Sequence, residues 1–130
     1  MVILDTCFII DLLRSKEPAI KIFDELEYKN EQFFIAAPTI SELWLGALKA
    51  KAHQMEKRRI EGFMNGATII SFGTRSAKRA AEVEFELEQK NTIIDTEDIQ
   101  IAATTLTHGE TLVTRDAHFA RIDGLRILKY

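Results

Sequence analysis

Cysteine, proline and glycine are scarce in this chain of 130 residues, which contains one, two and six of them respectively. The single thiol, Cys7, can form no disulfide within the chain and offers no cysteine pair for a zinc site. A reducing compartment, the cytoplasm, is therefore the expected location. The few prolines and glycines do not cluster as a linker would, so the sequence predicts one domain over residues 1–130.

Long apolar runs and an excess of positive charge are also missing. No stretch reaches the length of a membrane span, and the start of the chain lacks the basic segment of a secretion signal. Lys and Arg total 17 against 20 Asp and Glu, and the net charge of −3 argues against binding nucleic acid by overall charge. The charges are uneven, however, because residues 49–59 are basic and residues 82–98 are acidic. A local phosphate-contacting surface is compatible with this distribution.

Short apolar segments alternate with helical patterns along the chain. Strands are predicted at residues 2–4, 33–37, 68–72, 111–114 and 125–128. Helices are predicted between them, including one to residue 13, one from 18, a basic one ending near 65, a long one at 74–90 and one ending at 108–109. The strands are almost continuously apolar, which is typical of parallel strands covered on both faces. The sequence therefore predicts an α/β fold with a mostly parallel sheet of about five strands.

The segment after residue 38 has the clearest amphipathic pattern in the chain. Apolar residues recur there at helical spacing, namely Ile40, Leu43, Trp44, Ala47 and Leu48. We expect Leu48 to pack in the core with this stripe, whereas Leu45 lies off it.

Four carboxylates each lie where an apolar strand or turn gives way to a helix: Asp5, Glu42, Asp98 and Asp116. In a parallel α/β fold such points gather outside the carboxyl ends of the strands. Acids that share one pocket raise one another's pKa values, which is unfavourable without a cation. Hard oxygen ligands suit Mg²⁺ or Mn²⁺. The pattern therefore predicts a divalent-metal site and phosphoryl chemistry.

Taken singly, each acid has a plainer explanation. Asp5 and Asp116 suit a helix cap or a turn. Glu42 lies three residues after Thr39, as in a capping box, and Asp98 lies near a helix start, where the macrodipole favours an acid.

Two of the acids also lie next to buried faces. Glu42 directly precedes Leu43 of one apolar stripe, and Asp98 directly precedes Ile99 of another. An unpaired charge beside a buried face is expensive, and a shared cation removes that cost. Asp95 is interpreted first as a cap and second as a supporting or extra ligand.

Four motifs then occur in order at suitable spacing: Val2-Ile3-Leu4-Asp5-Thr6, Thr39-Ile40-Ser41-Glu42-Leu43, Asp98-Ile99-Gln100-Ile101-Ala102-Ala103, and Thr111-Leu112-Val113-Thr114-Arg115-Asp116 followed by Phe119. With these motifs the chain resembles the PIN-domain ribonucleases, in particular the VapC-type toxins of prokaryotic toxin–antitoxin pairs. The resemblance covers essentially the whole chain. It implies a three-layer α/β/α domain in which Asp5, Glu42, Asp98 and Asp116 bind Mg²⁺ or Mn²⁺, with Thr6 and Thr114 beside them.

The function implied is that of a divalent-metal-dependent endoribonuclease acting as a toxin. A water activated by the cation would hydrolyse RNA and leave a 5′ phosphate and a 3′ hydroxyl. The resemblance further implies a homodimer and a cognate antitoxin that covers the acidic site, with no membrane partner. Trp44, Leu45 and Leu48 offer surface for such contacts, although core packing is favoured for Leu48. Arg115 is a candidate phosphate contact.

Other functions stay open at this point. The chain could be a non-catalytic PIN-like protein-binding module, or a metal-dependent nuclease acting on DNA. A phosphoacceptor or phosphatase domain is disfavoured, because Asp5-Thr6-Cys7 lacks the second acid typical of such sites. Cys7 is expected to be a small buried apolar residue, and none of the three histidines is assigned to catalysis.

Overall fold

A computed structural model describes residues 1–130 as five strands, six α-helices and one short 3₁₀ helix. In chain order these are β1 (Val2–Leu4), α1 (Thr6–Leu13), α2 (Glu17–Tyr28), β2 (Phe33–Ala36), α3 (Ala37–Lys49), α4 (His53–Met64), β3 (Thr68–Ile70), α5 (Thr74–Gln89), α6 (Thr96–His108), β4 (Thr111–Val113), η1 (Ala117–Arg121) and β5 (Arg126–Leu128). None of the helices combines the length and the apolarity that crossing a membrane requires.

The five strands form one parallel sheet in the order β3-β2-β1-β4-β5. The chain first builds outward from β1 through β2 to β3, and then returns to add β4 and β5 on the other side of β1. The strand order therefore reverses between β1 and β4. In open parallel sheets the crevice beyond the carboxyl ends at such a reversal is where ligands bind.

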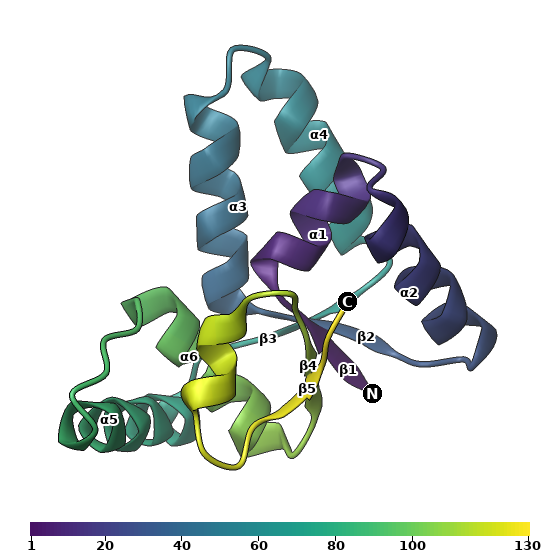
Figure 1. Ribbon diagram of the computed structural model, residues 1–130. Coiled ribbons are helices and arrows are strands. Elements are labelled where there is room, and N and C mark those ends of the chain that lie inside the picture. The colour runs from purple at the N-terminus through teal and green to yellow at the C-terminus, as the bar shows by residue number, and fades with distance from the viewer.

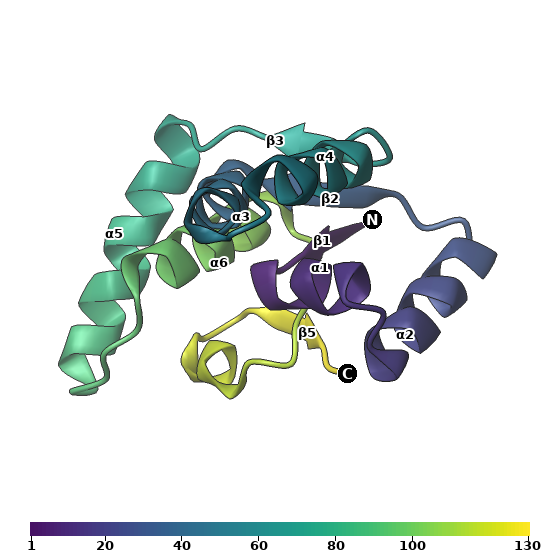
Figure 2. The ribbon, with the colours of Figure 1, turned by 90° about the horizontal axis from the view of Figure 1, so that it is seen from above.

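Helices cover both faces of the sheet. Val2 and Leu4 pack into a core shared with α1 to α4, whereas Ile3 points to the opposite face and packs in a second core with α5, α6 and η1. Figure 1 shows α1 to α4 on one side of the strands and α5 and α6 on the other, and Figure 2 shows the same arrangement from above. The predicted three-layer α/β/α fold with a parallel sheet is confirmed.

The predicted elements all exist; β1 has the predicted bounds, and the other four strands are shorter than predicted. β2 ends at Ala36 because α3 begins at Ala37. β4 ends at Val113, one residue before the predicted end at Thr114. Asn91 and Gly109 adopt the left-handed conformation after α5 and α6, with φ of 53° and 63°. These positions end the two helices, as predicted.

The prediction for Leu48 is wrong. Its side chain is 53% exposed, as exposed as that of Leu45 at 52%. Leu43 and Ala47 fill the buried positions of α3, while Trp44 is half-buried with the Lys57 ammonium 5.5 Å from its ring centre. The reason is visible in Figure 1, where the far end of α3 rises away from the sheet and has only α4 beside it.

Candidate active site

Asp5 and Thr114 meet because β1 and β4 are neighbours in register. Leu4 pairs with Val113, so the next residue of each strand lies at the same edge of the sheet. The Thr114 hydroxyl donates a hydrogen bond of 2.7 Å to Oδ2 of Asp5 and accepts one of 3.0 Å from the amide of Asp116. One fully buried threonine therefore links two of the predicted acids.

Glu42 and Asp98 come from the helices on opposite sides of the sheet. Glu42 lies in the second turn of α3, and its Oε1 accepts a hydrogen bond of 2.6 Å from the Thr6 hydroxyl. Asp98 lies in the first turn of α6. The capping-box explanation for Glu42 is excluded, because α3 begins at Ala37 and the carboxylate bonds across to α1 instead.

The four acids share one electrostatic environment. Burial, followed by the charges of Asp5, Glu42 and Asp116, raises the pKa of Asp98 to about 7. Burial also raises the pKa of Asp5 and, with nearby acids adding to it, that of Glu42. The structure thus brings together residues up to 111 positions apart in the sequence, and the charges of Asp5, Glu42 and Asp116 make Asp98 harder to ionise.

One buried oxygen in this site has no hydrogen-bond partner, Oδ1 of Asp5. Its companion Oδ2 accepts bonds from Thr114 and from the Cys7 thiol, so the carboxylate is fixed in place while one oxygen stays free. A buried acceptor without a donor costs on the order of 1–3 kcal/mol. A cation would satisfy it, and hard carboxylate ligands fit Mg²⁺ or Mn²⁺.

The acids are not closed around a single point. No three His, Cys, Asp or Glu side chains lie close enough together to hold one ion as they stand. Repulsion between like charges favours such a spread. Ligation of a metal by Asp5, Glu42, Asp98 and Asp116 therefore stays a prediction, which the free oxygen of Asp5 and the raised pKa values support.

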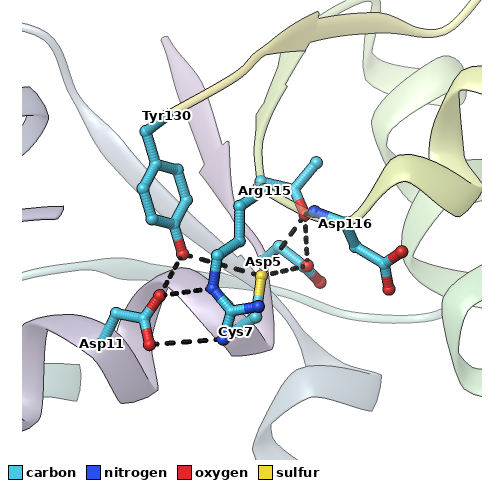
Figure 3. Close-up of polar contacts among 7 residues, drawn as sticks. Asp5, Cys7, Asp11, Arg115, Asp116 and Tyr130 are labelled. Carbon is cyan, nitrogen blue, oxygen red and sulfur yellow. Dashed lines mark hydrogen bonds and ion pairs between the residues drawn. The ribbon is translucent and has the colours of Figure 1, made fainter. Parts of the chain in front are cut away.

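A second polar cluster lies behind Asp5 on the α1 side, as Figure 3 shows. Cys7 donates a hydrogen bond of 3.0 Å to Asp5, and the Tyr130 hydroxyl lies 3.7 Å from its sulfur. Tyr130 and the Nε of Arg115 both donate to Oδ2 of Asp11, at 2.8 and 2.7 Å. Burial raises the pKa of Cys7, so a neutral thiol acts as the donor, not the apolar filler that the sequence suggested.

This cluster was not predicted, because the contacts of Arg115 and Tyr130 with Asp11 and Cys7 join residues 104 to 123 positions apart. Arg115, predicted to contact phosphate, is held by Asp11 through Nε and Nη2. His118 was not assigned a role, yet its amide and its Nδ1 both contact Oδ1 of Asp116, at 2.9 and 2.6 Å.

The residues on the approach to α6 are more exposed. Asp95 occupies the N-cap position, as predicted, but its exposed side chain makes no capping hydrogen bond. Its charge contributes to the raised pKa of both Glu42 and Asp98. Asp95 is therefore near the acids, whereas a direct part in binding an ion stays a prediction.

A parallel sheet between two helical layers, with carboxylates gathered at the β1/β4 switch point, defines a class of small α/β domains with an acidic site at the carboxyl edge. Within that class, the chain belongs to the PIN domain family, whose sequence profile matches residues 2–125.

Named relatives support a narrower grouping. The chain is 32% identical over 102 residues to Ribonuclease VapC2 of Rickettsia felis, covering 78% of this chain and 76% of that protein. It is 28% identical over 125 residues to the tRNA(fMet)-specific endonuclease VapC of Salmonella typhimurium, covering 95% and 93%. A chain in the crystal structure of VapBC2 from Rickettsia felis bound to a promoter DNA fragment superposes with a TM-score of 0.92 at 26% identity, covering 100% of this chain and 99% of that one.

Proposed function

We propose that this chain is a divalent-metal-dependent endoribonuclease that hydrolyses RNA phosphodiesters and acts as the toxin of a toxin–antitoxin pair in the cytoplasm. The observation that carries the proposal is the free, buried oxygen of Asp5 among acids whose pKa values are raised. A protein that only binds a partner gains nothing from such repulsion. The ribonuclease names of the relatives support RNA as the substrate.

Asp5, Glu42, Asp98 and Asp116 would hold Mg²⁺ or Mn²⁺. When bound, the ion lowers the pKa of water and offsets negative charge on the phosphate.

The chain's own hydroxyls keep the carboxylates in position for this role. Thr6 holds one oxygen of Glu42, and Thr114 holds one oxygen of Asp5 together with the amide of Asp116. Asp5 thereby keeps one buried oxygen free of any hydrogen bond, available to a cation.

An antitoxin partner belongs to the same proposal. The related complex is named VapBC2, which supports a second protein that binds the toxin. An open pocket of about 300 Å³ lies between α1, α3 and α4, with Glu42 among its lining residues. Its apolar wall consists of Ile10, Leu13, Leu43, Ala47, Ala50 and Ile60. The polar side chains of the pocket carry both signs of charge, Arg14 and Arg59 beside Glu42 and Glu56, so it suits an antitoxin segment that packs apolar side chains and places polar ones at the rim. Exposed Leu45 and Leu48 on α3 add apolar surface for this partner or for a second copy of the chain in a homodimer.

The test is cleavage of structured RNAs, including tRNA and ribosomal fragments, by the purified chain free of antitoxin. We expect cutting in Mg²⁺ or Mn²⁺ that leaves 5′ phosphates, stops in EDTA and disappears in Asp98→Asn. Asp24→Asn, which removes an exposed acid on α2, is the matched control and should cut normally.

Two results would redirect the proposal. If folded, antitoxin-free protein binds no divalent ion, the non-catalytic protein-binding module becomes the better description. If DNA of the same sequence is cut as fast as RNA under the same conditions, the substrate class is wrong.

A further inference from the structure

An open pocket of about 370 Å³ lies beside the acidic site, on the side of α1 and α2. It is lined by Asp11, Lys16, Pro18, Arg115 and Tyr130. Figure 3 shows Asp11, Arg115 and Tyr130 converging there, next to Cys7 and Asp5. Nothing in the proposed cleavage chemistry uses this pocket.

The one acid in the pocket is already neutralised. Both oxygens of Asp11 accept hydrogen bonds from Arg115, and Oδ2 also accepts one from Tyr130. These bonds lower the pKa of Asp11, which is buried and stays ionised. Asp11 therefore serves as an anchor that fixes the plane of the Arg115 guanidinium.

The two basic side chains of the pocket, Arg115 and Lys16, in contrast, can still bind another ligand. Arg115 uses Nε and Nη2 on Asp11, while Nη1 makes no hydrogen bond, and the side chain is 55% exposed. Lys16 is exposed and takes part in no ion pair. Its backbone amide donates to the carbonyl of Asp11 at 2.9 Å, which fixes the α1–α2 turn beside the guanidinium. With two cations and one acid, the pocket has a net positive charge.

The position of this charge matters because RNA is a polyanion and the neighbouring site is acidic. Arg115 is followed directly by Asp116, and the Tyr130 hydroxyl contacts Cys7, which contacts Asp5. An RNA chain whose scissile phosphate lies at the four acids would therefore have its neighbouring phosphates next to the pocket. A guanidinium held by a carboxylate is preorganised for a phosphate, since little of its side-chain entropy remains to be lost.

We propose that Lys16 and Arg115 form a phosphate subsite that binds the RNA backbone next to the phosphate being cut. The proposal rests on the proposed ribonuclease function. It assigns Lys16 to substrate binding and Asp11 to positioning Arg115. Lys16 makes no contact with Asp5, Glu42, Asp98 or Asp116, so its loss should weaken binding and leave the chemical step unchanged.

The first test measures binding without cleavage. In the Asp98→Asn background, a fluorescein-labelled RNA hairpin is titrated by anisotropy at several salt concentrations. Lys16→Ala should weaken binding about threefold to tenfold and reduce the magnitude of the negative slope of log association constant against log[salt] by about 0.7, the loss of one phosphate contact. Lys78→Ala, which removes an exposed lysine on α5, is the matched control and should change neither quantity.

The second test uses the active chain and the RNA that it cuts. Lys16→Ala should raise KM and leave kcat unchanged, since it removes binding that substrate and transition state share. Arg115→Gln should have the larger effect on KM and Arg115→Lys an intermediate one, with circular dichroism confirming that both variants fold.

The outcomes separate this subsite from the function it rests on. If RNA is cut but Lys16→Ala and Lys78→Ala give the same KM and the same salt slope, the subsite is wrong and the nuclease stands. If Lys16→Ala lowers the salt slope while the wild-type chain cuts no RNA, the subsite stands and the nuclease is wrong. If the hairpin does not bind and the wild-type chain cuts none of the RNAs tested, both are wrong.

Discussion

The hydroxyl of Thr114 donates a 2.7 Å hydrogen bond to Oδ2 of Asp5 across 109 positions of sequence. The same oxygen of Thr114 accepts from the amide of Asp116, so one side chain fixes the ends of two neighbouring strands. This bond follows from the parallel pairing of β1 with β4, which places the two residues side by side. Thr114 therefore couples the fold directly to the geometry of the acids.

Replacing Thr114 by valine keeps the shape of the side chain and removes these hydrogen bonds. Oδ2 of Asp5 would lose its hydroxyl donor while Oδ1 already lacks one, so we expect the free energy of unfolding to fall by about 1–3 kcal/mol. RNA cleavage should fall about tenfold to a hundredfold, because carboxylate ligands depend on such supports. Urea denaturation and initial cleavage rates measure the two effects.

Thr105→Val is the matched control for this substitution. Thr105 is equally buried, but its hydroxyl bonds only to the carbonyl of Ile101 within α6. Its replacement should cost roughly 1 kcal/mol or less and leave cleavage intact. Equal loss of cleavage in the two variants would show that Thr114 acts through general stability alone.

The sequence was sufficient to predict the sheet, the helices and the proximity of the four acids, because each depends on local patterns, while their part in binding a metal stays a prediction. Alternating apolar segments fix the strands, and in a parallel sheet the residues after them must gather at one edge. The acids Asp5 and Asp116 could be placed together for this reason alone.

Contacts that depend on side-chain direction could not be predicted in this way. The Asp11–Arg115 ion pair requires the register of β1 against β4 and the path of the turn that follows β4. Leu48 shows the opposite error. It follows the helical spacing of the stripe, but the far end of α3 lies away from the sheet, and α4, the one element beside it, leaves Leu48 exposed.

The raised pKa of Asp98 predicts how stability changes with pH. Its pKa is about 7 in the folded chain against an ordinary value of 3.8, so the folded state holds this proton more tightly than the unfolded state. Protonation of Asp98 therefore stabilises the folded state at low pH. This stabilisation decreases as pH rises from about 4 to about 7, and above that range the free energy of unfolding changes no further on account of Asp98.

Asp98→Asn isolates this effect, because the amide stays neutral at every pH. In EDTA, the melting temperature of the variant minus that of the wild-type chain should increase from about pH 4 to about pH 7. Allowing for solvent screening of this half-exposed group, we expect a final difference of about 2–4 °C. Asp24→Asn provides the control, and differential scanning calorimetry the measurement. A difference that stays flat across this range would contradict the raised pKa.

Divalent cations should stabilise the chain, and more strongly at higher pH. An ion that binds only the folded state raises the melting temperature with concentration, and it must displace any protons on the acids that hold it. Because the pKa values of Asp5, Glu42 and Asp98 are all raised, protons compete effectively with the ion for these carboxylates at acidic pH.

Thermal denaturation with Mg²⁺ or Mn²⁺ at about pH 8 and about pH 5.5 tests this competition. The rise in melting temperature should be clear at the higher pH, nearly absent at the lower, and reversed by EDTA. Asp98→Asn should reduce the rise at the higher pH. The same rise in the wild-type chain at both pH values would argue that the ion binds elsewhere.

His118 should position Asp116 for binding the cation. Its amide and its Nδ1 both contact Oδ1 of Asp116, and since a carboxylate only accepts hydrogen bonds, the proton lies on the nitrogen side. The second oxygen of Asp116 is then left for the ion. His118→Ala keeps the amide bond and removes the ring, so Mn²⁺ affinity, measured by electron paramagnetic resonance, should fall about tenfold to a hundredfold.

Two further variants distinguish positioning from the mere presence of an imidazole. His118→Asn, whose side-chain amide can also donate to Oδ1, should recover part of the Mn²⁺ affinity, whereas His53→Ala removes an exposed histidine on α4 and should change nothing. The histidine acts on the ion only through Asp116, so in the Asp116→Asn background His118→Ala should have little further effect on Mn²⁺ affinity. An undiminished effect in that background would instead mean that His118 meets the ion itself.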